Sequence, residues 1–173
     1  STGHRNPQGA AVRPGSNELW LTEHGPQGGD ELNLVAQGRN YGWPVKSYGC
    51  NYDESKPKDA ACRIGGGTHT GFVEPKAIWV PTSTAPSGLM FYDGNQFPDW
   101  RGNVFSGALG GTTLWRIVLD GNGNAVSRQE IGAVKSLGVR IRDVRQGPDG
   151  ALYVVTDAAN GELWKIVPRS SGS

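Results

Sequence analysis

Two stretches of nearly matching sequence decide the fold: residues 113–118, TLWRIV, and residues 162–167, ELWKIV. Both place apolar, aromatic and basic residues in the same order, and residues 31–35, ELNLV, are a looser copy. Each copy follows another run that favours an extended strand; these runs are residues 18–22, 103–106 and 151–156. Repeated pairs of short strands are typical of β-propellers, in which each blade is one small antiparallel sheet.

Turn signals and length set the number of blades. Asp-Gly pairs begin at Asp93, Asp120 and Asp149, and this pair supplies the positive φ that hairpin turns need. No segment keeps apolar residues at helical spacing. A blade takes about 40–45 residues, but residues 38–69 carry few strand signals and are expected to form an inserted loop. We therefore predict an all-β fold, a single partial propeller domain of about three blades over residues 1–173.

The ends of such an array need a cover. Propellers close with about 4–8 blades, so three blades cannot make a ring alone. Both ends would expose strand edges and apolar blade faces. We expect the ring to be completed either by a second copy of the chain, as a homodimer, or by a missing half.

Charge and hydropathy exclude several classes of function. The chain of 173 residues has 17 Lys and Arg against 16 Asp and Glu, so its formal net charge is +1. This balance gives no electrostatic footprint for nucleic acid or for an anionic membrane. No apolar run approaches the ~18 residues of a membrane-spanning helix. We therefore expect neither nucleic acid nor a membrane span among the partners.

Two cysteines, Cys50 and Cys62, lie in a polar part of the expected loop. A zinc site would need CxxC pairs or histidines at ligand spacing, which this stretch lacks. A disulfide that closes the loop is the simplest interpretation, and it would indicate an oxidising compartment. Two unpaired thiols in a cytosolic protein are the alternative.

Two arginines one residue apart, Arg140 and Arg142, form the best-defined candidate binding pair. In an extended strand both side chains project on the same side, because the side-chain period is two, while Ile141 and Asp143 face the other way. Two guanidinium groups on one side suit a ligand with carboxylates. The alternative is a pair of solvated arginines on an edge strand.

Two loops carry further candidate groups. Residues 3–8, GHRNPQ, gather an imidazole, a guanidinium and amides, and the alternative there is a plain polar turn. Residues 22–31, TEHGPQGGDE, offer the oxygen ligands that Ca²⁺ prefers, and the alternative is a wide hairpin loop. The histidines His4, His24 and His69 have no zinc-binding spacing, and no phosphate-binding or nucleophile-elbow motif occurs.

Five motifs together resemble one family. They are residues 3–9 (GHRNPQG), 23–26 with 30–31 (EHGP and DE), 40–44 (NYGWP), 85–88 (APSG) and 140–143 (RIRD). The chain resembles the soluble aldose sugar dehydrogenases that depend on pyrroloquinoline quinone (PQQ), relatives of soluble glucose dehydrogenase. The likeness runs from His4 to about Pro168 and implies the C-terminal half of the family's six-bladed propeller. It also implies a periplasmic or secreted enzyme that oxidises aldoses to lactones with PQQ and Ca²⁺.

The resemblance implies cofactor contacts for five side chains. Arg5 falls where the family has an arginine near the PQQ carbonyls, which makes it the catalytic candidate, and Asn6 falls where an asparagine binds PQQ. Arg140 and Arg142 match an arginine pair that faces the PQQ plane and its carboxylates. Ser83 lies where a hydroxyl residue meets a cofactor carboxylate.

The resemblance also implies a calcium site made of backbone. The carbonyls of Gly25 and Pro26 correspond to those that hold the Ca²⁺ bound to PQQ. PQQ carries three carboxylates, so cations and a divalent metal must offset its charge. The metal would also polarise the quinone.

Two departures limit what the resemblance implies. Some family members have a lysine where this chain has Gly110, so one carboxylate partner is lost. The family's catalytic base is a histidine of the N-terminal half, which this chain does not contain, and His4 and His24 match other motifs. We therefore expect weak or no dehydrogenase activity from this chain alone. The alternative is a non-catalytic half-propeller, truncated or engineered, that self-assembles as a binding module. A sugar lactone hydrolase ranks last, because the carboxylates that could bind its metal lie in one loop.

Overall fold

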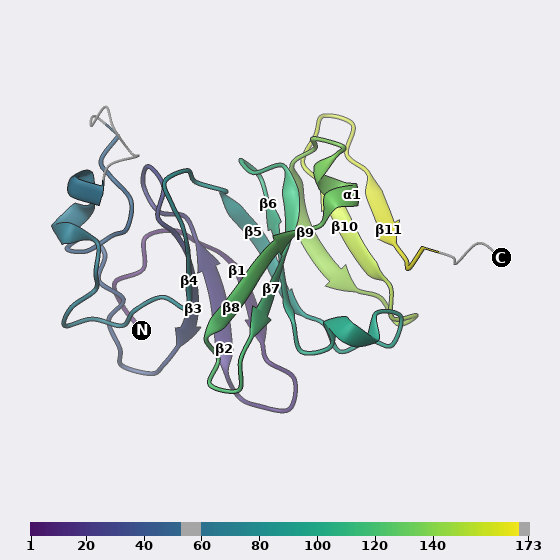
Figure 1. The fold of residues 1–173 in the computed structure, drawn as a ribbon, viewed down its shortest axis with the longest axis horizontal. Coiled ribbons are helices and arrows are strands. Elements are labelled where there is room, and N and C mark those ends of the chain that lie inside the picture. The colour runs from purple at the N-terminus through teal and green to yellow at the C-terminus, as the bar shows by residue number, and fades with distance from the viewer. Residues whose placement is uncertain (53–59, 170–173) are drawn as a thin grey trace.

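The computed structural model describes residues 1–52 and 60–169, which form three antiparallel sheets side by side (Figure 1). The sheets have the orders β1-β2-β3-β4, β5-β6-β7-β8 and β9-β10-β11. Their strands are β1 (Pro7–Val12), β2 (Leu19–Glu23), β3 (Asp30–Val35), β4 (Ala77–Trp79), β5 (Pro86–Phe91), β6 (Val104–Ala108), β7 (Thr113–Leu119), β8 (Ala125–Glu130), β9 (Ile141–Gln146), β10 (Leu152–Thr156) and β11 (Leu163–Ile166). Three small sheets of sequential strands are the arrangement of propeller blades. The predicted all-β partial propeller is confirmed.

The sequence repeat marks one position in every sheet. Residues 31–35, 113–118 and 162–167 fall on β3, β7 and β11, which are the third strands of their sheets. The strand-rich runs that precede them fall on the second strands, β2, β6 and β10. The repeat therefore reflects the equivalent packing that each blade requires.

The first strands of the three sheets pack side by side, with β5 between β1 and β9. Ser87 donates through Oγ to the carbonyl of Ile141 at 2.7 Å, and Arg145 donates through Nη1 to the carbonyl of Leu89 at 2.9 Å. The contact that lies further along β5 also lies further along β9, so the two strands run parallel. Gly9 of β1 lies so close to the Ser87 carbonyl that no side chain would fit.

Two apolar cores lie between neighbouring sheets. One joins the first and second sheets, and its buried residues are Trp20, Leu32, Ala77, Trp79, Leu89, Phe91, Val104 and Ile117. The other joins the second and third, and its buried residues are Met90, Tyr92, Phe105, Leu114, Val134, Ile141, Val144, Leu152 and Val154. Each large apolar side chain contributes about 1.5–3 kcal/mol when fully buried. These cores fix the position of one blade against the next.

The free face of the third sheet has no such cover among the residues described. Leu163 of β11 is 67% exposed, whereas Leu114, at the matching position of β7, is fully buried. The described chain is therefore an open array of blades, and completion of a ring by a second copy or another half stays a prediction.

The described part of the expected loop, residues 38–52 and 60–69, falls between β3 and β4 in the sequence and lies along one side of the first sheet (Figure 1). This part contains two short 3₁₀ turns, η1 (Ala60–Cys62) and η2 (Ile64–Gly66). Residues 53–59 of this predicted loop lie outside the described residues. The other helical elements are η3 (Pro98–Trp100) and α1 (Gly132–Lys135), and none of the described helices is long and apolar enough to cross a membrane.

A disulfide joins Cys50 to Cys62, as the simplest interpretation of the sequence predicted. The Cα atoms lie 5.2 Å apart. Cys50 also exchanges both backbone hydrogen bonds with Gln27, each at 3.0 Å, so the cross-linked loop is attached to the segment after β2.

Candidate functional site

The predicted site residues gather where the first strands begin. Arg5 and Asn6 immediately precede β1, Ser83 lies three residues before β5, and Arg140 immediately precedes β9. Because these strands pack side by side and β5 and β9 start at the same end, residues far apart in sequence meet at one end of the molecule.

A pocket of about 590 Å³ lies at this end, between the first two sheets. Its lining includes five of the seven predicted residues: Arg5, Asn6, Gly25, Pro26 and Ser83. This volume is within the usual range of about 300–1,000 Å³ for small-molecule sites. The structure therefore brings together the predicted cationic, amide, hydroxyl and carbonyl groups, while Arg140 and Arg142 are not part of this lining.

Arg5 has donors to spare. Its Nη1 makes one long hydrogen bond to the carbonyl of His24 at 3.4 Å. Its Nε is buried and has no hydrogen-bond partner among residues 1–52 and 60–169. The guanidinium lies 5.2 Å from the ring centre of Trp43 and 5.9 Å from that of Tyr52. A partly desolvated guanidinium near two aromatic rings, with unused N–H groups, suits a planar anionic or carbonyl ligand.

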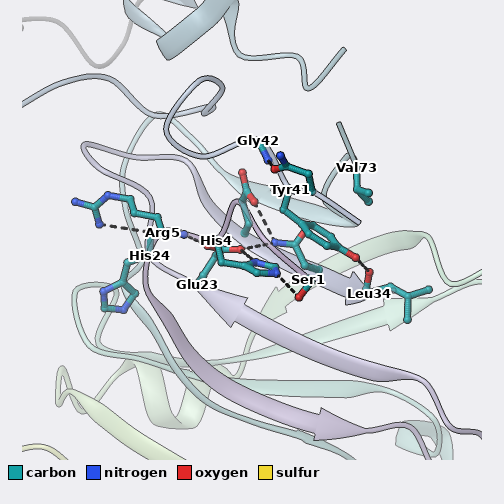
Figure 2. Close-up of polar contacts among 12 residues, drawn as sticks. Ser1, His4, Arg5, Glu23, His24, Leu34, Tyr41, Gly42 and Val73 are labelled. Atoms are coloured by element: carbon teal, nitrogen blue, oxygen red, sulfur yellow. Dashed lines mark hydrogen bonds and ion pairs between the residues drawn. The ribbon is translucent and has the colours of Figure 1, made fainter. Parts of the chain in front are cut away.

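Residues behind Arg5 hold it in place (Figure 2). The buried carboxylate of Glu23 accepts a hydrogen bond from the backbone N–H of Arg5 at 2.7 Å and lies 2.8 Å from His4 Nδ1. The His4 ring stacks on Tyr41 with the ring centres 4.4 Å apart. His4 is therefore a positioning residue in this structure. Of the sequence motif before β1, Arg5 and Asn6 line the pocket, whereas His4 supports them from outside it.

A second buried carboxyl group lies next to Glu23. Asn33 donates through Nδ2 to Glu23 at 2.8 Å and to Glu31 at 3.0 Å. Burial, with a further contribution from the nearby Glu23 carboxylate, raises the pKa of Glu31 to about 8. The Nε2 atom of buried His69 lies 3.5 Å from Glu31. At neutral pH Glu31 therefore keeps its proton, which avoids placing two buried negative charges side by side.

Asn6 and His24 both line the pocket, and their side chains are neighbours. His24 Nε2 lies 2.7 Å from the carbonyl of Pro86, so this nitrogen carries the proton and donates. The Asn6 side-chain amide faces His24 Nδ1 at 3.5 Å, and its oxygen accepts a hydrogen bond from Gln8 at 3.0 Å. The weak contact at 3.5 Å leaves the Asn6 N–H groups available to a ligand.

The backbone at Gly25 and Pro26 offers two oxygen atoms. No hydrogen bond within the described part of the chain engages either carbonyl, although both residues are buried and line the pocket. The same part of the chain holds no cluster of three or more His, Cys, Asp or Glu side chains that could bind a metal. A cation here would depend on backbone oxygens, which Ca²⁺ accepts.

Asp30 ties the two walls of the pocket together, a role that the sequence did not reveal. Its buried carboxylate accepts hydrogen bonds from the backbone N–H of Gly25 at 2.9 Å and of Thr84 and Ala85 at 2.7 Å each. Ser83 also donates through Oγ to Asp30 at 2.6 Å. Asp30 was only one member of a candidate calcium loop in the sequence, because three of its four partners lie more than fifty residues away.

Arg140 and Arg142 project on the same side, as the strand period predicted. Arg140 donates through Nε to Asp157 at 2.6 Å, and Arg142 donates through Nη2 to the other oxygen of Asp157 at 3.0 Å. The arginine side chains are 48% and 47% exposed, and Ile141 between them is buried. The pair therefore already shares one carboxylate, a partner that the motif itself did not predict.

Fold and site together define part of a β-propeller with a ligand pocket where its inner strands begin. The family model described as Glucose / Sorbosone dehydrogenase matches residues 1–165. The chain belongs to this family of sugar dehydrogenases, as its motifs predicted.

Individual relatives agree with this assignment. The chain is 46% identical over 170 residues to the aldose sugar dehydrogenase YliI of Escherichia coli, covering 98% of this chain and 44% of that protein. The crystal structure of the soluble aldose sugar dehydrogenase from Escherichia coli in the apo-form matches with a TM-score of 0.81 and 42% identity, over 97% of this chain and 46% of that one. The PQQ-bound aldose sugar dehydrogenase from Streptomyces coelicolor matches with a TM-score of 0.63 and 32% identity, over 96% and 43%. The chain thus spans less than half the length of these relatives.

Proposed function

We propose that this chain carries the cofactor-binding part of a dehydrogenase that oxidises aldoses to lactones and depends on PQQ and Ca²⁺. The observation that carries the proposal is Arg5, whose buried Nε is unpaired within the described residues at the wall of a 590 Å³ pocket. The solved structure of the similar aldose sugar dehydrogenase from Streptomyces coelicolor is a PQQ-bound form, which supports the choice of cofactor.

The donor set fits this cofactor. Arg5 and Asn6 would bind and orient PQQ through N–H groups that are little used, and the carbonyls of Gly25 and Pro26 would hold Ca²⁺. The Ser83 hydroxyl already donates to Asp30, so it would meet a ligand as a hydrogen-bond acceptor unless that bond is exchanged. When bound, PQQ supplies a two-electron acceptor, which the Ca²⁺ ion would polarise.

The proton of the sugar hydroxyl requires a base, which we place outside this chain on the family resemblance. His24 is a poor substitute, because its Nε2–H is donated to Pro86 and its Nδ1 faces the Asn6 amide. We infer that Arg140 and Arg142 face the same cofactor from the third blade, where a cofactor carboxylate would compete with Asp157. The disulfide supports a periplasmic or secreted location, because disulfides persist in oxidising compartments.

Dye reduction by the purified chain tests the activity. We expect little reduction with glucose or other aldoses in the presence of PQQ and Ca²⁺, and rapid reduction once the chain is joined to the N-terminal half of a relative such as the Escherichia coli enzyme. Rapid turnover by the chain alone would overturn the placement of the base. No turnover by the joined, folded protein with any aldose would overturn the proposed activity.

A second candidate, a half-propeller that pairs with a second copy and lacks turnover, is favoured by the open third blade. An apolar groove of about 550 Å³ lies between Val134 of α1 and Leu163 of β11. Edge-to-edge pairing of two copies would cover such surface and double the arginine set around the axis. Light scattering on a sizing column tests it: a stable dimer supports self-pairing, and a folded monomer contradicts it.

A further inference from the structure

A second pocket lies beside the cofactor pocket, across the segment of residues 81–83 that lines both. It has a volume of about 390 Å³ and is formed by the outer strands of the first and second sheets. Its other walls carry the side chains of Trp79, Trp115, Arg128 and Glu130. All the residues that line this pocket lie within the described part of the chain, on the first and second sheets and the segment that joins them.

The apolar wall consists of the half-buried indole ring of Trp115, with the almost fully buried Trp79 next to it. Trp79 and Trp115 meet edge to face, with ring centres 5.9 Å apart. Trp115 is half-buried, and its Nε1 donates to Thr84 Oγ1 at 2.7 Å, which fixes the ring. Trp79 is 5% exposed, and its Nε1 has no hydrogen-bond partner in the described part of the chain. An unpaired buried donor at a pocket wall is an unusual cost for a folded protein.

The polar wall offers both donors and acceptors. The Arg128 guanidinium lies over the Trp79 ring, 5.3 Å from its centre, and its Nη1 donates to the carbonyl of Ile78. These two contacts fix the guanidinium plane, and its remaining N–H groups stay available. Glu130 adds a carboxylate, which pairs with Lys135 Nζ at 3.0 Å. A preorganised donor beside a fixed acceptor needs little reordering when a ligand binds.

We propose that this pocket binds one pyranose unit of a carbohydrate. A sugar ring has an apolar C–H face that packs on indole and hydroxyl groups that use donors and acceptors together. An anion would suit Arg128 but not the Glu130 carboxylate beside it, and an apolar ligand would cover the remaining N–H groups of Arg128 without offering them an acceptor. The choice of a carbohydrate as the ligand rests on the proposed function, because this pocket shares residues 81–83 with the pocket to which we assign the cofactor of sugar oxidation.

Tryptophan fluorescence of the chain, titrated with glucose, maltose and maltotriose without PQQ, tests this site. We expect a saturable change that tightens from glucose to maltotriose. Arg128→Gln, a change on an exposed side chain, should weaken binding at least tenfold, and Glu130→Gln should weaken it as well. Arg13→Gln serves as the matched control, because Arg13 pairs with Glu18 in the hairpin between β1 and β2, away from both pockets.

The outcomes separate this site from the proposed function. No saturable change with folded protein, or unchanged affinity in both Arg128→Gln and Glu130→Gln, overturns the carbohydrate site. Tight binding of citrate or phosphate without sugar binding would show an anion site and would also overturn it. PQQ binding, measured separately by absorbance, reports on the cofactor pocket: sugar binding without PQQ binding contradicts only the cofactor assignment.

Discussion

The two arginine sites that the sequence predicted for one cofactor differ in how they are surrounded. Arg5 lies in a pocket between two complete blades, stacked near Trp43 and Tyr52, with a buried Nε that is unpaired in the described chain. Arg140 and Arg142 lie at the edge of a three-stranded blade, about half exposed, and share Asp157. The residue type is the same, but only the first site has a buried arginine donor with no partner among the described residues.

The contrast shows that an arginine motif forms a strong binding site when the surrounding residues exclude water from the guanidinium and leave some of its N–H groups without a partner. Exposed ion pairs contribute about 0–1 kcal/mol because water screens them, whereas a charged hydrogen bond in a partly buried pocket contributes about 1.5–3 kcal/mol. We therefore expect the pocket at Arg5 to dominate cofactor affinity.

The sharpest test of the contrast compares the carboxylates that support each site. Asp30→Ala removes four hydrogen bonds and leaves buried N–H groups unpaired, so we expect the free energy of unfolding to fall by about 4 kcal/mol. Asp157→Ala is the matched control in the exposed site, and its expected loss is much smaller, because water screens its ion pairs with Arg140 and Arg142. Urea denaturation measures both, and equal losses would erase the distinction between the two sites.

The disulfide supports only the first site. Opening the loop between Cys50 and Cys62 in the double variant Cys50→Ser/Cys62→Ser should lower the free energy of unfolding by about 3 kcal/mol, the usual value for a loop of this size. Because Cys50 is paired with Gln27, next to Pro26, Ca²⁺ affinity should fall as well. Denaturation and calcium titration check this, and an unchanged calcium affinity would separate the loop from the cation site.

Burial of Glu31 gives the stability of the first blade a dependence on pH. Its folded pKa of about 8 lies above the ordinary 4.5, so the folded state binds the extra proton and stability falls as pH rises between these values. The slope is at most about 1.4 kcal/mol per pH unit. In Glu31→Gln this slope should disappear, and above pH 8 the variant should be more stable than the wild type.

Thermal unfolding across pH measures this dependence. Glu162→Gln, on an exposed side chain, should keep the wild-type slope. If the stability of Glu31→Gln changed with pH as steeply as that of the wild type, the pH dependence would belong to another group.

The arginines themselves can be compared directly. Arg5→Gln should weaken PQQ binding about 10–100-fold, because it removes charged donors from a partly buried pocket. Arg142→Gln should weaken it less than about fivefold, because that side chain is 47% exposed and already paired with Asp157. Fluorescence titration with PQQ ranks the two, and the reverse order would move the centre of the site to the third blade.

Gly110 is a position at which a cationic partner for a cofactor carboxylate can be added. A Cβ there would lie 3.5 Å from Ala85 Cβ, an ordinary contact, so a side chain fits beside the segment that lines the pocket. Gly110→Lys should tighten PQQ binding up to about fivefold through one exposed ion pair. Gly110→Gln is the uncharged control, and an equal gain in both variants would exclude a charge effect.

Much of the fold could be predicted because the repeat records local strand packing. The motifs at residues 113–118 and 162–167 occupy the third strand of their blades. The different burial of Leu114 and Leu163 could not be predicted, because it depends on whether another blade covers the face.

The site was predictable to the extent that its residues lie next to strand starts. Arg5, Asn6 and Ser83 meet because their strands begin at one end. The roles of Asp30 and Asp157 depend on partners distant in sequence, which no local spacing reveals. The Trp79 pocket was missed for the same reason, because its second wall comes from another blade.

The most direct test of the central claim is equilibrium dialysis of the folded chain against PQQ, with Ca²⁺ and then with a chelator. The pocket at Arg5, Gly25 and Pro26 predicts one PQQ per chain with Ca²⁺ and much weaker binding after chelation. A folded chain that binds no PQQ, or that binds it equally without Ca²⁺, would contradict the assignment of this pocket.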